Sequence, residues 1–199
     1  MASSEDDAAT AKPEGDAPFA LQLKNVSFAH PGSRTEVLSD VSLTLRAGER
    51  VAVVGASGAG KSTLLAAVAA DLTPQAGHVS AQPACLLTQR TELFQDSLRD
   101  NLRLADPAAS DEHLWAVLQA AGLDADVRAL SIGLDTRLGE GGLGLSGGQS
   151  RRLALARLLL RPVPLWLLDE PTEALDAAVA HDVLQRLAQH AGTRTLLIA

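Results

Sequence analysis

The chain has 199 residues, of which 46% are hydrophobic and 21% are charged, and its formal net charge is −7. A chain of this length can bury a full hydrophobic core and form one domain, or one domain with an inserted lobe. Its longest apolar run, residues 153–168, is interrupted by arginines and prolines. No run therefore approaches the ~18 residues of a membrane-spanning helix, so another segment or chain must supply any membrane role. The acidic balance, without a clustered basic stripe, argues against a nucleic-acid surface.

Residues 1–18 are rich in Ala, Ser, Asp, Glu and Pro and lack periodicity, which predicts a disordered leader or linker rather than a signal peptide. Cys85 is the only cysteine, so we expect a reducing compartment and a small apolar side chain inside a strand. The chain stops within the apolar run 195–199, which we interpret as a C-terminal truncation.

The pattern of apolar residues predicts a mixed α/β chain. The expected strands are residues 21–28, 41–45, 50–54, 84–87, 165–168 and 195–199. The β-branched run 50–54 is typical of a buried central strand. The expected helices are residues 62–70, most of 97–160, and 177–191. Within them, one buried face combines Leu114, Val117, Leu118 and Ala121, and the segment 153–160 is apolar nearly all round.

Residues 55–62 (GASGAGKS) fit the phosphate-loop pattern G-x-x-x-x-G-K-[ST] between a predicted strand and a predicted helix. Its glycines let successive N–H groups point at phosphate oxygens, and the helix that follows adds its positive end. Lys61 supplies a charge for the β- and γ-phosphates, and the Ser62 hydroxyl is placed to ligate Mg²⁺. The candidate ATP-binding residues here are Gly55, Ala56, Ser57, Gly58, Ala59, Gly60, Lys61, Ser62 and Thr63.

The run 165–170 (LWLLDE) ends in two acids at the carboxyl end of a predicted strand, the edge at which parallel sheets bind ligands. It has the form of a Walker B motif. We expect Asp169 to hold Mg²⁺, directly or through water. Glu170 is the candidate general base that polarises the attacking water.

The order of the phosphate loop, Gln89, the segment 145–149 (LSGGQ), the two acids and Asp176 resembles the nucleotide-binding domain of ABC transporters. This resemblance covers nearly the whole chain from about residue 21. It implies an α/β P-loop NTPase (RecA-like) core with an antiparallel β subdomain and an inserted α-helical signature subdomain. The implied core is about 19–90 and 160–199, the helical subdomain about 91–159, and the domain 19–199 is incomplete at its C-terminus.

The resemblance also implies that two such domains sandwich two ATP molecules, each between one phosphate loop and the partner's LSGGQ. The signature residues that would contact ATP are Ser146, Gly147, Gly148 and Gln149. They begin a predicted helix, whose N-terminus attracts anions, and one chain cannot fold it onto its own phosphate loop. Gln89 resembles the Q-loop residue that touches Mg²⁺ and the water and signals to a membrane domain. Asp176 ends a segment similar to the D-loop and is a further nucleotide-contact candidate.

The segments 93–102 and 139–142 are similar to the exporter class of this family. Within it, the strings LRDNL, LGEGG and DEPTEALD resemble the CydC-type subunits of bacterial heterodimeric exporters of cysteine and glutathione, which support cytochrome bd assembly. The resemblance implies a non-identical second nucleotide-binding domain and a transmembrane domain missing from this chain. It also implies a position at the cytoplasmic face of the bacterial inner membrane.

The sequence departs from the family pattern at three places. His30 stands where an aromatic side chain usually stacks on adenine, and its alternative interpretation is a turn residue beside a proline. Glu173 replaces a small D-loop serine, which adds a carboxylate near the expected interface and would weaken one ATP site. Family members carry a switch histidine just after the last strand, so we expect this chain alone to hydrolyse ATP weakly or not at all.

The remaining polar residues have simpler interpretations. We expect four histidines on the solvated surface, namely His78, His113, His181 and His190. We also expect Arg151 and Arg152 on a solvated helix face and Trp166 in the core. Two alternatives to an exporter ATPase stay open: a soluble, non-transport ABC protein acting on DNA or ribosomes, and a regulatory half-site that binds ATP with little hydrolysis.

Overall fold

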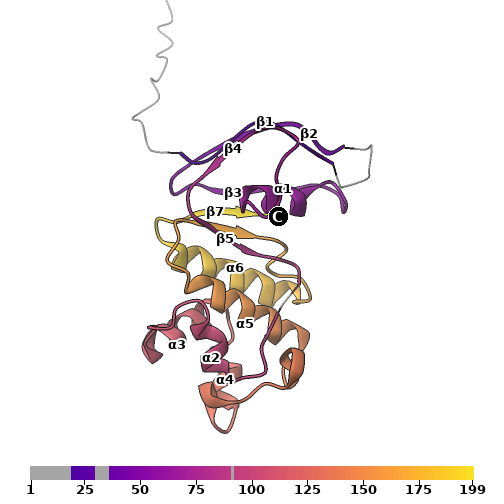
Figure 1. Ribbon diagram of the computed structural model, residues 1–199. Helices are drawn as coiled ribbons and strands as arrows, with labels where there is room; N and C mark the ends of the chain where they lie inside the picture. The colour runs from indigo at the N-terminus through magenta and orange to yellow at the C-terminus, as the bar shows by residue number, and fades with distance from the viewer. Residues whose placement is uncertain (1–18, 30–35, 91) are drawn as a thin grey trace, which may run out of the picture.

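The computed structural model describes residues 19–29, 36–90 and 92–199. The predicted leader 1–18 and His30 lie outside the described residues. Figure 1 shows the layers from top to bottom: an antiparallel sheet, helix α1, a parallel sheet, helices α5 and α6, and a lobe of short helices. The expected α/β fold, with an antiparallel β subdomain and an inserted helical subdomain, is confirmed. The residue limits of the subdomains stay a prediction.

The antiparallel sheet has the strand order β2-β1-β4. Its strands are β1 (Phe19–Ala29), β2 (Glu36–Arg46) and β4 (Ala76–Ala81). Alternate residues of β1, such as Leu21 and Leu23, are buried in one cluster with Leu64 and Leu65 of α1 (Lys61–Val68). The strands predicted at 21–28 and 41–45 are therefore confirmed, and both are longer because their pairing continues to Ala29 and Glu36.

The parallel sheet has the strand order β3-β7-β6-β5. Its strands are β3 (Arg50–Ala52), β5 (Ala84–Leu87), β6 (Leu165–Leu168) and β7 (Thr195–Ile198). All four residues of β6 are buried, because it has a strand on each side and a helical layer on each face. Leu165 and Leu167 pack in the cluster of α1, and Trp166 and Leu168 pack in that of the other helices. This two-sided burial explains the uninterrupted apolar run.

The prediction of a buried central strand at residues 50–54 is wrong. Within the described ranges β3 pairs only with β7, at the edge of the sheet, and its Arg50 and Ala52 are exposed. Val51 and Val53 pack against the core, whereas Val54 is 88% exposed. An edge strand that is covered on one face also accepts β-branched residues on its open face. The β-branched composition of residues 50–54 therefore did not show whether the strand is buried on one face or on both.

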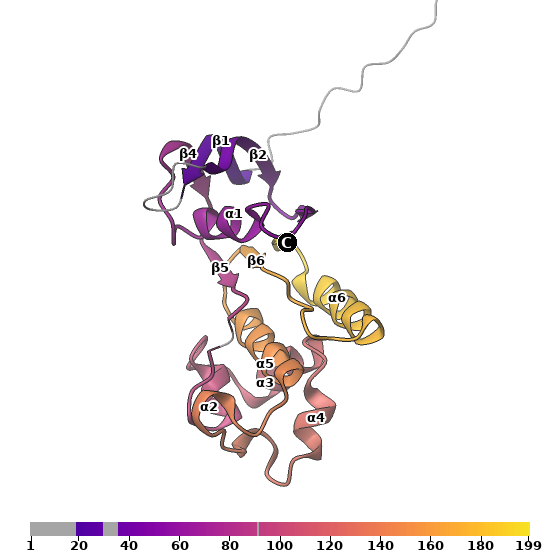
Figure 2. The same ribbon diagram turned by 90° about the vertical axis from the view of Figure 1, so that its right-hand side faces the viewer.

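The helices gather on the other side of the parallel sheet (Figures 1 and 2). They are α2 (Leu98–Arg103), α3 (Asp111–Ala120), α4 (Asp124–Ala129), α5 (Gly147–Leu159) and α6 (Ala177–Ala191), with short 3-10 turns at Gly133–Asp135 and Glu140–Gly142. The predicted buried face from Leu114 to Ala121 and the nearly all-buried segment 153–160 are both confirmed. In the residues that the structure describes, no helix is long and apolar enough to span a bilayer.

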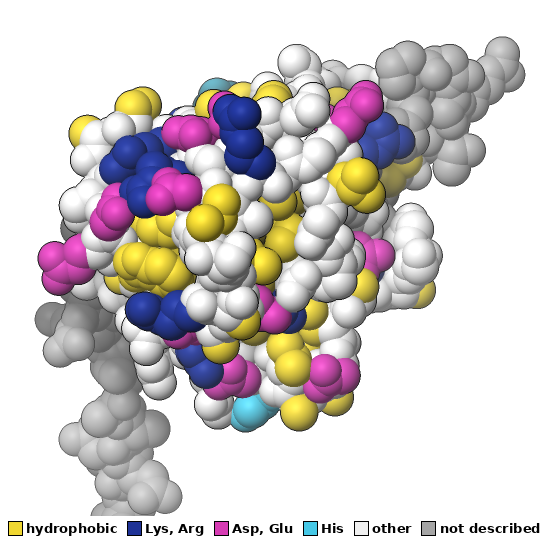
Figure 3. All heavy atoms as spheres, turned by 90° about the horizontal axis from the view of Figure 1, so that it is seen from below, with side chains coloured by type: hydrophobic (Ala, Val, Ile, Leu, Met, Phe, Trp, Pro, Cys, Tyr) yellow, Lys and Arg dark blue, Asp and Glu magenta, His cyan; other side chains and the backbone are white. Residues whose placement is uncertain are grey.

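The helical lobe carries charges of both signs. Seen from below, arginine or lysine side chains lie next to acidic ones, around small apolar areas (Figure 3). Arg99 illustrates the pattern, since it pairs with Asp111 and, at 2.8 Å, with Asp135. Because these side chains are partly exposed, each pair contributes little to stability.

The histidine prediction holds for three of four residues. His78, His113 and His181 are exposed, whereas His190 is half-buried and stacks on the fully buried Trp166, with ring centroids 6.2 Å apart. Burial also holds the pKa of His190 below its usual value. The solvated interpretation of His190 is therefore wrong, because α6 packs this face against β6.

Asn101 of α2 fixes the chain segment that enters the helical lobe. It is 1% exposed, and its Oδ1 accepts a hydrogen bond from the Phe94 N–H at 2.9 Å. Its Nδ2 donates to the carbonyl oxygens of Phe94 and Ser97, both at 3.0 Å. One side chain thus satisfies three polar backbone groups.

Replacement Asn101→Leu should lower the free energy of unfolding by about 1–3 kcal/mol, because it leaves buried polar groups without partners. Urea denaturation followed by circular dichroism measures this loss. The control is Gln119→Ala at an exposed position of α3. Equal stability of the two variants would contradict the role of Asn101.

Candidate functional site

The phosphate loop lies between β3 and α1. Gly58 and Gly60 have φ angles of +79° and +88°, a region that side chains with a Cβ rarely adopt. A Cβ on Gly60 would also approach the Val37 carbonyl oxygen to 2.9 Å. These two glycines are therefore required by backbone geometry, and the loop residues before Gly60 are exposed.

Lys61 closes the loop upon itself. Its Nζ donates to the carbonyl oxygens of Gly55 at 3.0 Å and Ala56 at 3.1 Å. Lys61 also begins α1, and no acidic residue stands in the first turn of this helix. The ammonium group and the helix N-terminus thus give this loop a positive character suited to phosphate.

A pocket of about 240 Å³ brings part of the phosphate loop together with Gln89 and Glu170, whereas Asp169 does not line it. It is lined by Val37, Ser57, Gly58, Gly60, Lys61, Ser62, Thr63, Gln89 and Glu170. Gln89 follows β5 and Glu170 follows β6, so parallel pairing delivers both beside the loop after β3. Gly55, Ala56 and Ala59 belong to the same loop but do not line the pocket.

Asp169 is buried behind Glu170. It is 5% exposed, and its N–H donates to the Leu87 carbonyl oxygen at 2.9 Å. Its carboxylate atom Oδ1 is buried with no hydrogen-bond partner among the described residues. A partnerless carboxylate oxygen is costly unless a cation or water satisfies it, so Asp169 fits the Mg²⁺ role.

Within the described ranges, no group of three or more His, Cys, Asp or Glu side chains could hold a metal alone. A site with Asp169 as its one carboxylate ligand suits Mg²⁺, which is usually held by one or two protein ligands together with substrate phosphates and water. The Ser62 hydroxyl and the Gln89 amide are the other predicted ligands, and both residues are exposed at the pocket.

Glu170 has a φ angle of +46°, which is uncommon for a residue other than glycine. Its N–H donates to the Ala199 carbonyl oxygen at 3.0 Å, beyond the end of β7. Such a conformation costs roughly 1–3 kcal/mol and persists only where the surroundings hold it. The candidate general base therefore stands on a constrained piece of backbone.

The signature segment begins α5 with a capping box. The Ser146 hydroxyl accepts from the Gln149 N–H at 3.2 Å, and the Gln149 Oε1 accepts from the Ser146 N–H at 2.9 Å. Ser146 and Gly147 are exposed. At Gly148 a Cβ would lie 3.2 Å from Leu175, so the D-loop packs closely here. No residue of 145–149 lines the phosphate-loop pocket.

Asp176 has a structural task of its own. Its Oδ1 accepts from the N–H groups of Ala178 at 3.1 Å and Val179 at 3.0 Å, which caps the N-terminus of α6. Helix capping is enough to explain why an aspartate stands at position 176, even if it does not contact a nucleotide. Contact of Asp176 with ATP stays a prediction.

The sequence interpretation of Arg151 and Arg152 as a solvated face is wrong. Arg151 is 4% exposed and donates to backbone carbonyls beside the pocket. Arg152 is partly buried and pairs with Asp126 at 2.8 Å. A signal was present, since Arg151 precedes Leu155 and Leu158 by one and two helical turns and shares their buried face.

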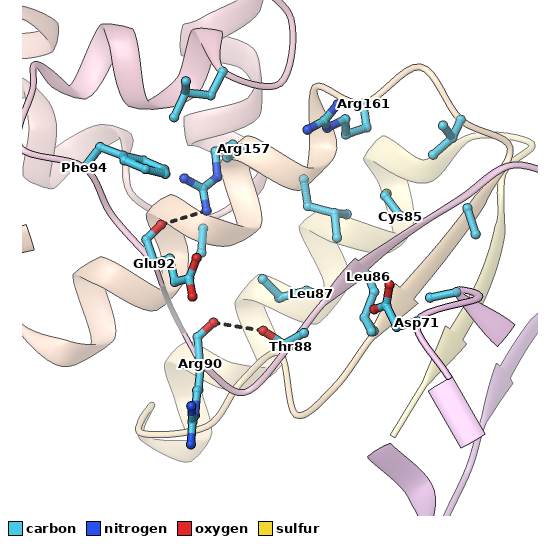
Figure 4. Close-up of a pocket in the computed structure, with 16 residues that line it drawn as sticks. Asp71, Cys85, Leu86, Leu87, Thr88, Arg90, Glu92, Phe94, Arg157 and Arg161 are labelled. Carbon is cyan, nitrogen blue, oxygen red and sulfur yellow. Dashed lines mark hydrogen bonds between the residues drawn. The ribbon is translucent and has the colours of Figure 1, made fainter. Parts of the chain in front are cut away.

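A second cavity, of about 620 Å³, is lined by β5, by residues after it such as Thr88 and Phe94, and by α5. Figure 4 shows the side chains around it: Arg157 donates to the Glu92 carbonyl oxygen at 2.8 Å, near Phe94. Phe94 is 53% exposed. Cys85 also lines this cavity; it lies in a strand, as predicted, but is only partly buried, and burial raises its pKa to about 12.

A family model described as "ABC transporter" matches residues 38–173. The chain is 41% identical over 193 residues to the "Glutathione/L-cysteine transport system ATP-binding/permease protein CydC" of Escherichia coli (strain K12), covering 90% of this chain and 33% of that protein. It is 36% identical to the "Mycobactin import ATP-binding/permease protein IrtB" of Mycobacterium tuberculosis (strain ATCC 25618 / H37Rv), covering 89% and 33%.

Among solved structures, "Structure of a bacterial Atm1-family ABC exporter with ATP bound" matches with a TM-score of 0.81 at 33% identity, covering 90% of this chain and 34% of that one. The chain thus spans about a third of the length of the curated relatives it matches. The family match agrees with the phosphate loop, the buried acid and the capped signature helix. The chain belongs to the ABC transporter family, as an ATP-binding domain of the exporter type.

Proposed function

We propose that this chain binds and hydrolyses ATP to power export across a membrane, as one of two nucleotide-binding domains. One observation carries the proposal: a single pocket combines the phosphate loop with Gln89 and Glu170, while the signature segment lies outside it. The domain therefore offers one half of two different ATP sites. A second domain, facing it head to tail, completes both.

In the site built on this chain's phosphate loop, the loop N–H groups and Lys61 bind the phosphates. Ser62, Asp169 and Gln89 would hold Mg²⁺, which would neutralise negative charge on the phosphate oxygens. Glu170 orients a water molecule and accepts its proton as the water oxygen attacks the γ-phosphorus, and the bond to the bridging oxygen breaks to release ADP. This chain's Ser146 and the N–H groups of Gly147 and Gly148 stabilise the phosphoryl group that is transferred in the partner domain's site.

For the cargo, we propose cysteine or glutathione, in support of cytochrome bd assembly and with a non-identical partner domain, at the cytoplasmic face of a bacterial inner membrane. The 41% identity to the CydC protein supports this choice. The "Glutathione/L-cysteine transport system ATP-binding/permease protein CydD" of Bacillus subtilis (strain 168), at 34% identity, supports it further.

We also propose that the second cavity receives the membrane portion of the transporter. Thr88, next to the Q-loop residue Gln89, is one of the residues that line it, so a segment bound there can sense the ATP site. Phe94 and Leu104 are about half exposed at this cavity. An apolar segment bound there would remove their apolar surface from water, which would stabilise the contact.

A regulatory half-site with little hydrolysis is the second candidate function. Glu173 favours it, because this exposed carboxylate stands three residues after Glu170 in the segment that packs on the signature helix. A negative charge there would repel the phosphates of an ATP held across the interface.

Lys61→Ala should weaken ATP binding by about 10–100-fold, because a charged hydrogen-bond donor to the phosphates is lost. Calorimetric titration with Mg-ATP measures this change. Lys24→Ala, at an exposed position of β1, is the matched control. Unchanged affinity in Lys61→Ala would argue against this loop as the ATP site.

Glu170→Gln should keep ATP binding and lower hydrolysis by about 10²–10⁴-fold, because the amide cannot accept the proton. The measurement is phosphate release by the full-length protein with its partner domain. Glu112→Gln, on the exposed side of α3, serves as the control. Unchanged turnover in Glu170→Gln would favour the half-site.

Phe94→Ser should reduce transport into vesicles by about tenfold, because an apolar anchor of the membrane contact is lost. Binding of ATP should not change. The control is Ile132→Ser, a residue of the helical lobe that is 60% exposed and does not line the cavity. Equal transport by both variants would rule out this cavity as the docking place.

A further inference from the structure

Arg151 is a buried cation that the ATP chemistry described above does not use. It stands one turn into α5, on the side that faces the sheet, and it is 4% exposed. Burying a guanidinium costs free energy unless its donors are well paired. Its hydrogen-bond partners should therefore indicate what it does.

The two terminal nitrogens of Arg151 donate hydrogen bonds to two different pairs of carbonyl oxygens. Nη1 donates to Thr88 and, at 3.3 Å, to Gln89, in the segment that follows β5. Nη2 donates to Asp169 and, at 2.9 Å, to Glu170, in the segment that follows β6. One planar group thus joins the backbones of the two segments that supply the pocket's Gln89 and Glu170.

The charge of Arg151 suits this place. Asp169, Glu170 and Glu173 all favour the charged guanidinium, while burial, the larger effect, lowers its pKa. Arg151 donates its hydrogen bonds to backbone carbonyl oxygens, so it does not occupy the oxygens of these carboxylates.

The strained backbone of Glu170 needs such support. Its φ angle of +46° is held on one side by the N–H bond to Ala199 and on the other by the bonds of Arg151 to the Asp169 and Glu170 carbonyls. Without the arginine, the buried Asp169 carbonyl and the partly buried Glu170 carbonyl would lose a donor, and the conformation would lose one of its restraints.

We propose that Arg151 is a positioning residue for hydrolysis, which fixes Glu170 relative to Gln89 by clamping the backbones that carry them. This proposal rests on the proposed ATPase function. It assigns Arg151 no contact with ATP, since it does not line the phosphate-loop pocket. Removal should therefore affect kcat and leave ATP binding nearly intact.

The test uses the full-length protein assembled with its partner domain in lipid nanodiscs. The variants are Arg151→Lys and Arg151→Gln, with Arg103→Gln as the control, because Arg103 also donates to a backbone carbonyl, that of Ala109, but in the helical lobe. Turnover is normalised to the number of ATP-binding sites titrated in each sample, so loss of folded protein does not count as loss of catalysis.

A lysine keeps the charge but cannot span both carbonyl pairs as a planar guanidinium does. We expect kcat per site to fall about 10–100-fold in Arg151→Lys, and at least as far in Arg151→Gln, because small misplacements of catalytic groups have effects of this size. The KM for ATP should stay within about threefold, since only a step after binding changes. Arg103→Gln should match the unmutated protein.

A double-mutant cycle separates positioning from a general structural role. In a Glu170→Gln background, single-turnover assays should show that Arg151→Lys has little further effect, because the group it positions is already gone. Unchanged kcat per site in Arg151→Lys, or effects that multiply in the double variant, would overturn the proposal. Absence of hydrolysis in the unmutated complex would instead overturn the ATPase function, and with it the role of Arg151.

Discussion

Parallel pairing of β5, β6 and β7 is the constraint on which the site depends. The register aligns Leu87 with Leu168 and Leu168 with Ile198, so the three strands end at one level. The residues that follow them, Gln89 and Glu170 among them, must then emerge at one edge of the sheet. The phosphate loop after β3 emerges at the same edge, because β3 pairs in parallel with β7.

Helix α5 connects this edge to the exposed signature segment, where we propose that a second domain binds. Its first turn is the exposed, self-capped signature segment, and its second turn carries Arg151 against the pocket backbones. Farther along, Leu155 and Leu159 are buried in the core. A rigid helix with these three attachments cannot shift at one end without straining the contacts at the other, which would couple the two half-sites that we propose.

Some of the unfavourable conformations of the described residues lie beside the site. Glu170, which follows the buried Asp169, has a φ angle of +46°, and Ala174, within the D-loop segment 171–176, has one of +62°. The Asp169 carboxylate keeps an unpaired buried oxygen among the described residues. The buried layers of β6, α5 and α6 supply the stability that lets these unfavourable features persist.

The sequence by itself determined the phosphate loop, the two acids, the signature and the α/β class, because each depends on local chemistry at fixed spacing. It also predicted the positions of β5, β6 and β7 and the apolar face of α3. It failed at β3, whose apolar composition does not distinguish an edge from a centre, and at His190, whose exposure depends on how α6 packs.

Only the tertiary structure decided that Arg151 faces inward and which carbonyls it joins. Those carbonyls belong to residues more than sixty positions before it and almost twenty after it. No local pattern can encode such contacts, since they exist only after β5, β6 and α5 have packed. The same holds for the pocket: residue types name the candidates, but parallel strand pairing alone brings Gln89 and Glu170 to the loop.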